Sequence, residues 1–175
     1  MKKIITSIFL LLAITCQAQS NFKIEKTDSV SKSQSQIYSD TKLFIAETWK
    51  SAQAVVQNDD KESGVILIKG NDIYLKSHAL NTIRYVFSYT VTFLMKEGKY
   101  KIILDNINYE SGICQGYNYP PIDICDSCEY PGYTTVAITK NGWLELTSTI
   151  KSDMQIIVKS YENYIKQTSK LSKDW

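Results

Sequence analysis

One long alternation of apolar and polar residues constrains the fold more than any other feature. Between Thr82 and Met95 one side of the pattern is aromatic and aliphatic: Tyr85, Phe87, Tyr89, Val91 and Phe93. A period of two is typical of a β-strand with one buried face. Lys96–Lys99, with Gly98, predicts a hairpin turn, and Tyr100–Ile107 is the expected partner strand. The short connection requires antiparallel pairing, so an antiparallel sheet is predicted.

Two helices are predicted on either side of these strands. Ser33 and Gln36 form a capping box, in which each side chain satisfies a backbone donor of the other, at the start of a helix of about five turns. Its apolar stripe, Trp49 included, predicts a core face and not a site: Ile37, Thr41, Phe44, Ile45, Thr48, Trp49 and Ala52. A second helix is predicted within Asn141–Lys170, after a turn at Asn141–Gly142. Its stripe is Leu146, Ile150, Met154, Ile157, Val158, Tyr161 and Ile165.

Shorter extended segments complete the pattern. Phe22 and Ile24 alternate with charged residues, which predicts a short strand. Val55 and Val56 open an extended segment, and Val65–Ile68 is an aliphatic strand that closes on Gly70. The acids between them lack the spacing of an EF-hand loop and favour a polar turn ending at Gly64: Asp59, Asp60 and Glu62.

The order of elements predicts an α+β fold of two layers, a curved antiparallel β-sheet with two long helices packed on one face. Three tracts carry a resemblance to a known family: AVVQNDDKESGVILIKG at 54–70, YVFSYTVTF at 85–93 and GKYKIILDNI at 98–107. They resemble a bacterial secreted family of unknown function that is described as having a fold like the TATA-binding protein. The resemblance covers residues 22–107 well, and it implies a fold and a compartment but no activity.

The N-terminus predicts export. Met1–Lys3 is positively charged, Ile4–Ile14 is mostly apolar, and Cys16-Gln17-Ala18 offers a cleavage site, so residues 1–18 are interpreted as a cleaved signal peptide. The apolar run is shorter than the roughly 20 residues of a membrane-spanning helix. Lipid modification of Cys16 is an alternative. A single domain over 19–175 is expected to be periplasmic, secreted or outer-membrane associated, with no transmembrane helix in the mature chain.

Charge argues against a nucleic-acid partner. The whole chain has a formal net charge of +2, and removal of Lys2 and Lys3 with the signal leaves equal numbers of basic and acidic residues. Phosphate binding requires a basic surface, which a neutral chain lacks. The likeness in fold to a DNA-binding protein therefore does not predict that function.

An irregular segment at 109–133 contains all three prolines of the chain and three of its four cysteines: Cys114, Cys125 and Cys128. In an oxidising compartment these cysteines predict one disulfide and one odd thiol. A zinc site with His78, the single histidine, and thioredoxin-like chemistry of the CxxC are alternatives. The spacing to His78 and the lack of a helix after the CxxC favour the disulfide, so no metal or cofactor is expected.

The same segment is rich in tyrosine. Its rings are either binding groups or rings that fold the loop onto the sheet: Tyr109, Tyr117, Tyr119, Tyr130 and Tyr133. Tyrosine offers a large contact area with a polar tip. The expected function is a non-enzymatic binding or structural module of the bacterial cell envelope, which contacts a protein or glycan through 109–133. The alternative is a hydrolase with a carboxylate pair that no motif marks, and no catalytic residue is assigned.

Overall fold

The computed structural model describes residues 21–78, 81–113, 122–124, 130–132 and 138–171. Within them the elements follow the order β1 (Ile24–Ser29), α2 (Gln34–Thr48), α3 (Ala52–Val55), β2 (Val56–Asp60), β3 (Val65–His78), β4 (Asn81–Lys96), β5 (Lys99–Ile113), β6 (Ile122–Asp123) and α5 (Lys140–Leu171). Both long helices and the long strands of the sequence prediction are present.

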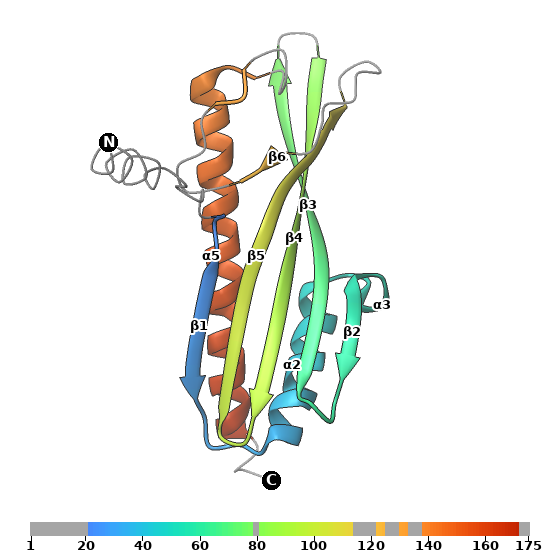
Figure 1. The fold of residues 1–175 in the computed structure, drawn as a ribbon, viewed down its shortest axis with the longest axis vertical. Coiled ribbons are helices and arrows are strands. Elements are labelled where there is room, and N and C mark those ends of the chain that lie inside the picture. Colours follow the sequence, from blue (N-terminus) through green and yellow to red (C-terminus); the bar gives the residue numbers. More distant parts are fainter. Residues whose placement is uncertain (1–20, 79–80, 114–121, 125–129, 133–137, 172–175) are drawn as a thin grey trace, which may run out of the picture.

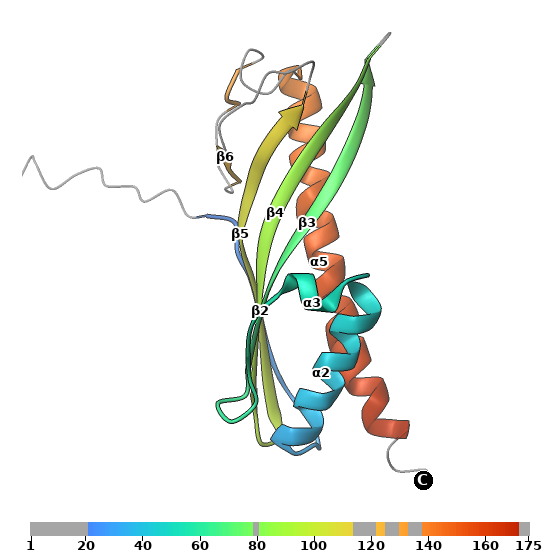
Figure 2. The same cartoon turned by 90° about the vertical axis from the view of Figure 1, so that its right-hand side faces the viewer.

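The strands form one antiparallel sheet of order β1-β5-β4-β3-β2, and β6 pairs with β5. Figures 1 and 2 show the sheet curved, with α2 and α5 on the same face. The α5 helix runs along nearly the whole sheet, whereas α2 covers only its lower half. The α+β two-layer prediction is therefore confirmed. No helix of the described chain is both long and apolar enough to cross a membrane.

The core lies between the sheet and the helices. The odd-numbered residues of β4 from Ile83 to Met95 are buried, as the alternation predicted. On β5 the buried positions change phase, from Ile102 and Leu104 to Ile107 and Tyr109. An irregularity in the pairing of β4 with β5 spans this change, and Asn106 there has a positive φ of 52°. Such a bulge inserts one residue and returns the following side chains to the core face.

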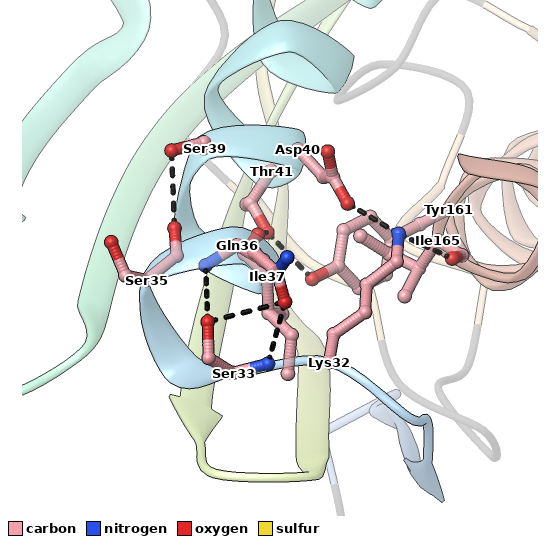
Figure 3. Close-up of polar contacts among 10 residues, drawn as sticks. All are labelled: Lys32, Ser33, Ser35, Gln36, Ile37, Ser39, Asp40, Thr41, Tyr161 and Ile165. Carbon is pink, nitrogen blue, oxygen red and sulfur yellow. Dashed lines mark hydrogen bonds and ion pairs between the residues drawn. The ribbon is translucent and has the colours of Figure 1, made fainter. Parts of the chain in front are cut away.

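Polar contacts fix the start of α2 and join it to α5 (Figure 3). The backbone N–H of Gln36 donates to Ser33 Oγ over 3.2 Å, and the backbone N–H of Ser33 donates to Gln36 Oε1 over 2.9 Å. These two bonds confirm the capping box. Buried Lys32 forms an ion pair with Asp40 and donates to the Ile165 carbonyl oxygen of α5 over 3.0 Å. A second link joins the two helices, because the hydroxyls of Thr41 and Tyr161 lie 2.8 Å apart.

Two turns agree with their predicted chemistry. Gly98, in the hairpin between β4 and β5, has a φ of +66°, a region that favours glycine. In the turn between β2 and β3, Asp60 Oδ1 accepts from the backbone amides of Glu62 and Ser63, both at 3.0 Å. The acid of this turn therefore caps backbone groups, as the sequence indicated.

Four boundaries differ from the prediction. The first helix ends at Thr48 with Trp49 as its C-cap, so Ala52, the last residue of the predicted stripe, lies beyond it at the start of α3. Strand β3 does not end at Gly70 but continues to His78. The glycine makes room for an aromatic ring, since a Cβ at this position would lie 2.4 Å from Tyr89 Cζ. Asn141–Gly142 belongs to the first turn of α5, where Gly142 N donates to Thr139 Oγ1 over 3.3 Å. Tyr109 belongs to β5 and is buried, so it is not part of a loop.

Candidate functional site

Most residues proposed from the sequence lie outside the described residues. These are the signal peptide with Cys16, and Cys114, Cys125, Cys128, Tyr117, Tyr119 and Tyr133. Tyr130 is partly buried, and its hydroxyl donates to the Ile138 carbonyl oxygen. His78 is the last residue of β3 and pairs with Asn81 of β4. The described part of the chain therefore brings none of these side chains together.

It does contain a pocket that no motif indicated. A hollow of about 440 Å³ lies between the end of α2, the middle of β3 and the middle of α5. We call it the edge pocket, and its lining consists of Thr48, Trp49, Asp72, Ile73, Tyr74, Tyr89, Asp153, Ile156 and Ile157. The lining combines two carboxylates, three aromatic rings and three isoleucines. No basic side chain is among these described lining residues.

The pocket arises from the unequal length of the elements. Strand β2 pairs only with the first part of β3, as far as Ile68, and α2 ends at Thr48. Beyond this point β3 continues for ten more residues to His78, along α5. The inner face of β3 is therefore covered by one helix there instead of two, and a hollow remains at the edge of the sheet.

Asp72 lies on the inner face of β3. It is in phase with Ile66 and Ile68, which are buried against the helices. Burial raises the pKa of the Asp72 carboxyl, and the negative charge of Asp153 raises it further. Within the described residues no hydrogen bond or ion pair to this carboxylate is formed. A carboxylate that is partly withdrawn from water beside another acid is destabilised in its charged form, and such groups are frequent in functional sites.

Asp153 approaches the pocket from α5 and is held by Tyr74. The Tyr74 hydroxyl donates to Asp153 Oδ2 over 2.7 Å. Its ring packs edge-on against Phe87, with centroids 5.8 Å apart. Burial and this hydrogen bond raise the pKa of the Tyr74 hydroxyl, so it remains a donor at any physiological pH. The position of the Asp153 carboxylate is thus defined by a residue of the facing strand.

The third wall is aromatic. Trp49 Nε1 donates to the Tyr89 hydroxyl over 3.1 Å, and the Tyr89 ring occupies the space that Gly70 leaves open. Burial, followed by the charge of Asp72, raises the pKa of Tyr89 to about 12. Trp49 itself is only partly buried, and Thr48 is exposed. The predicted core stripe of the first helix is therefore wrong at Thr48, whereas Trp49 packs against the core, edge-on to Phe44 with ring centroids 6.0 Å apart.

This arrangement can bind a ligand or perform acid–base chemistry. Two carboxylates accept hydrogen bonds and attract positive charge, and the aromatic rings offer flat apolar faces. Sequence reasoning missed Asp72 because it ended the strand at Gly70, although position 72 continues the inward phase of Ile66 and Ile68. Asp153 is next to the stripe residue Met154, but nothing in the sequence pairs it with Asp72. Among the described residues, no three His, Cys, Asp or Glu side chains lie together in an arrangement that could hold a metal ion.

A second hollow, of about 680 Å³, lies on the sheet and contains side chains of the face away from the helices. Its lining is mostly uncharged and polar: Ala54, Gln57, Lys69, Asn71, Val86, Ser88, Tyr89, Thr90, Asn106, Asn108 and Glu110. Several of these groups bond one another, since Ser88 donates to Glu110 and Asn108 Nδ2 donates to the Asn106 carbonyl oxygen over 2.9 Å. Unlike the edge pocket, this hollow has a basic side chain, Lys69, in its lining and a single carboxylate, which is bonded to Ser88.

Comparisons with known proteins agree with the fold. A family described as a domain of unknown function (DUF4468) with TBP-like fold matches residues 22–110. A DUF4468 family protein from Bacteroides ovatus superposes with a TM-score of 0.57 at 20% identity, over 81% of this chain and 85% of that one. A TBP-like protein from Parabacteroides distasonis superposes with a TM-score of 0.59 at 15% identity, over 86% and 97%. No curated protein matches the sequence.

Proposed function

This chain belongs to the DUF4468 family of unknown function with a TBP-like fold, and we propose a function for it that is based on its edge pocket. The protein is an exported, non-enzymatic binding module of the bacterial cell envelope, and the edge pocket is its recognition site. The observation that carries the proposal is the position of two carboxylates and three aromatic rings around one hollow of about 440 Å³. Concave sites with apolar walls and a few convergent polar groups are the usual form of ligand pockets.

The cost of Asp72 to the folded state supports this proposal. A carboxylate without a partner on the inner face of a strand, next to a second carboxylate, destabilises the fold. Natural proteins keep such groups mainly where a function requires them. Glu25, Asp28, Asp59 and Asp60 differ in this respect, since their pKa values are lowered by hydrogen bonds.

The export and the contact surface come from the sequence. Residues 1–18 have the pattern of a signal peptide, which supports a periplasmic, secreted or outer-membrane location. The segment 109–133 remains a proposed second contact with a protein or glycan, through Tyr117, Tyr119 and Tyr133. Tyr130 is a weaker candidate there, because its hydroxyl is bonded to the Ile138 carbonyl oxygen.

The proposal is tested by a ligand screen with a blocked pocket. Oligosaccharides, cell-wall peptides and aliphatic amines are screened by saturation-transfer NMR against the wild type, Thr48→Trp and Leu43→Trp. Thr48 is exposed and lines the pocket, so a large ring there closes its mouth. Leu43 is exposed on the same helix and does not line it. Ligands are expected to bind the wild type and the Leu43→Trp variant but not the Thr48→Trp variant. Binding that is unchanged in Thr48→Trp would show that the recognition site is not the edge pocket.

A hydrolase is the second candidate, and the presence of Asp72 and Asp153 in one hollow, where burial raises the pKa of Asp72, favours it. In glycoside hydrolases a carboxyl group with a raised pKa donates a proton while its ionised neighbour acts as base or nucleophile. Asp72 and Asp153 would take these two roles. Oligosaccharides from the screen are incubated with the protein and analysed by mass spectrometry. Cleavage that Asp72→Asn abolishes would make the protein an enzyme, and bound ligands recovered intact would reject this candidate.

A further inference from the structure

We infer that the ligand of the edge pocket is an organic cation, an ammonium group on a flexible alkyl chain of the size of a lysine side chain. The inference rests on the proposed function, since it names the ligand class of the same pocket. It is argued from the charge of the lining, from its aromatic rings and from the isoleucines that α5 contributes to it.

The charge of the pocket is negative and not balanced within its lining. Three successive inward positions of β3 face α5, and two of them form a link to that helix. Tyr74 donates to Asp153 over 2.7 Å, and Lys76 forms an ion pair with Glu145 over 2.7 Å. Asp72, the remaining position, has no such link in the described chain. The one basic side chain of this inward row is therefore committed to Glu145, and a cationic ligand would supply the missing countercharge.

Aromatic rings favour an organic cation over a neutral hydrogen-bonding ligand. Trp49, Tyr74 and Tyr89 line the same hollow as the two carboxylates, and Trp49 and Tyr74 are only partly buried, whereas Tyr89 is 3% exposed. A ring face attracts a cation through its quadrupole, and tryptophan does so best. The combination of ring faces with carboxylates is the chemistry by which proteins bind ammonium groups.

The apolar part of the lining matches an alkyl chain. Ile156 of α5 remains 58% exposed and lines the pocket together with the partly buried Ile157. Isoleucine side chains in a pocket lining lose contact with water when a methylene chain packs on them. A bare metal ion would use neither the isoleucines nor the rings, and hard divalent cations require more oxygen ligands than two carboxylates supply. The pocket is therefore suited to a cation that carries hydrocarbon.

The test compares two probes with the same four-carbon side chain, of which one ends in an ammonium group. Nα-acetyl-lysine methylamide and its norleucine analogue have side chains of similar length, and only the first carries an ammonium group. Binding is followed by titration of the Trp49 indole N–H resonance, which reports on the pocket through its hydrogen bond to Tyr89. The lysine probe is expected to shift this resonance in a saturable manner, with an affinity at least about tenfold above that of the norleucine probe.

Variants make the result specific to the carboxylates. Asp72→Asn keeps the shape of the side chain and is expected to weaken lysine-probe binding about tenfold. Glu62→Gln removes the same charge from an exposed turn outside the pocket and is expected to leave binding unchanged. Equal binding of both probes, or lysine-probe binding unchanged by Asp72→Asn, would overturn the cation while leaving the binding module in place. No shift with the lysine probe would also overturn it, and the Thr48→Trp screen then decides the proposed function separately.

Discussion

The Tyr74 hydroxyl donates a hydrogen bond of 2.7 Å to Asp153 Oδ2 and so connects β3, beyond the end of its pairing with β2, to the middle of α5. Helix α2 does not extend to this part of the sheet, so β3 is held there by its pairing with β4 and by the links of Tyr74 and Lys76 to α5. The bond therefore has two effects: it orients one carboxylate of the edge pocket, and it holds the strand that carries the other.

Replacement of Tyr74 by Phe removes this bond and keeps the ring against Phe87. We expect the free energy of unfolding to fall by about 1 kcal/mol, the typical contribution of one hydrogen bond. Urea denaturation measures the change. Tyr164→Phe is the control, because the Tyr164 hydroxyl donates over 3.2 Å to Glu47 in an exposed position and a smaller loss is expected there. A larger loss of unfolding free energy in the control would show that the Tyr74 bond does not contribute more to stability than an exposed hydrogen bond.

Asp72 makes stability depend on pH in an unusual direction. Its pKa is raised in the folded state, so the folded protein holds this proton more tightly than the unfolded chain. The resulting destabilisation is fully present above the raised pKa and vanishes below the ordinary value of 3.8. Asp72→Asn is therefore expected to raise the melting temperature at pH 7 and to give a smaller gain as the pH falls toward 3.8. Calorimetry across this range tests it, and a gain that grows on acidification would contradict the assignment.

The ion pair of Lys32 and Asp40 differs from the surface pairs. The Lys32 side chain is 3% exposed, and its ammonium also bonds the Ile165 carbonyl oxygen of α5. Asp40→Asn leaves the ammonium buried beside a neutral group, and we expect a loss of about 3 kcal/mol. Glu145→Gln breaks the exposed pair with Lys76 and should cost less than about 1 kcal/mol. Denaturant titrations of both variants give the comparison, and equal losses would rule out a special role for burial.

Gly70 is predicted to be required by one ring. Gly70→Ala places a Cβ 2.4 Å from Tyr89 Cζ, so the ring must move and its bond to Trp49 is disrupted. Overpacking of this kind typically costs about 1–3 kcal/mol. The loss should disappear when Tyr89 is first changed to Leu, which removes the obstructing atoms. A double-mutant cycle by urea denaturation checks this coupling. Additive losses would show that Gly70 is required for the backbone conformation and not for the space of the Tyr89 ring.

Local patterns in the sequence predicted those parts of the fold that depend on local chemistry. The alternation of β4, the capping box of Ser33 and the turn at Gly98 each involve residues a few positions apart, so neighbouring residues determine them. The end of β3 was predicted wrongly because a glycine inside a strand and a glycine after a strand look alike. Only the ring of Tyr89, 19 positions away, distinguishes the two cases.

The candidate site was beyond such reasoning. Asp72 and Asp153 meet because one strand extends past the end of α2 and one helix extends along it, and these lengths follow from packing of the whole molecule. The phase of β5 is a similar case, since the bulge at Asn106 reverses the alternation without a glycine to mark it. The sequence did predict that a carboxylate pair without a motif was possible, and it could not say which of 18 acids would form it.

The free edge of β3 gives Asp72 a further consequence, for solubility. From Lys69 to His78 the strand pairs with β4 on one side, and in the described chain no strand pairs with it on the other. Open edges of this kind can join the edges of other molecules and begin aggregation, and a charge that points inward on the edge strand opposes such joining. Loss of the Asp72 charge would thus yield a protein that is more resistant to heat and yet more prone to aggregate.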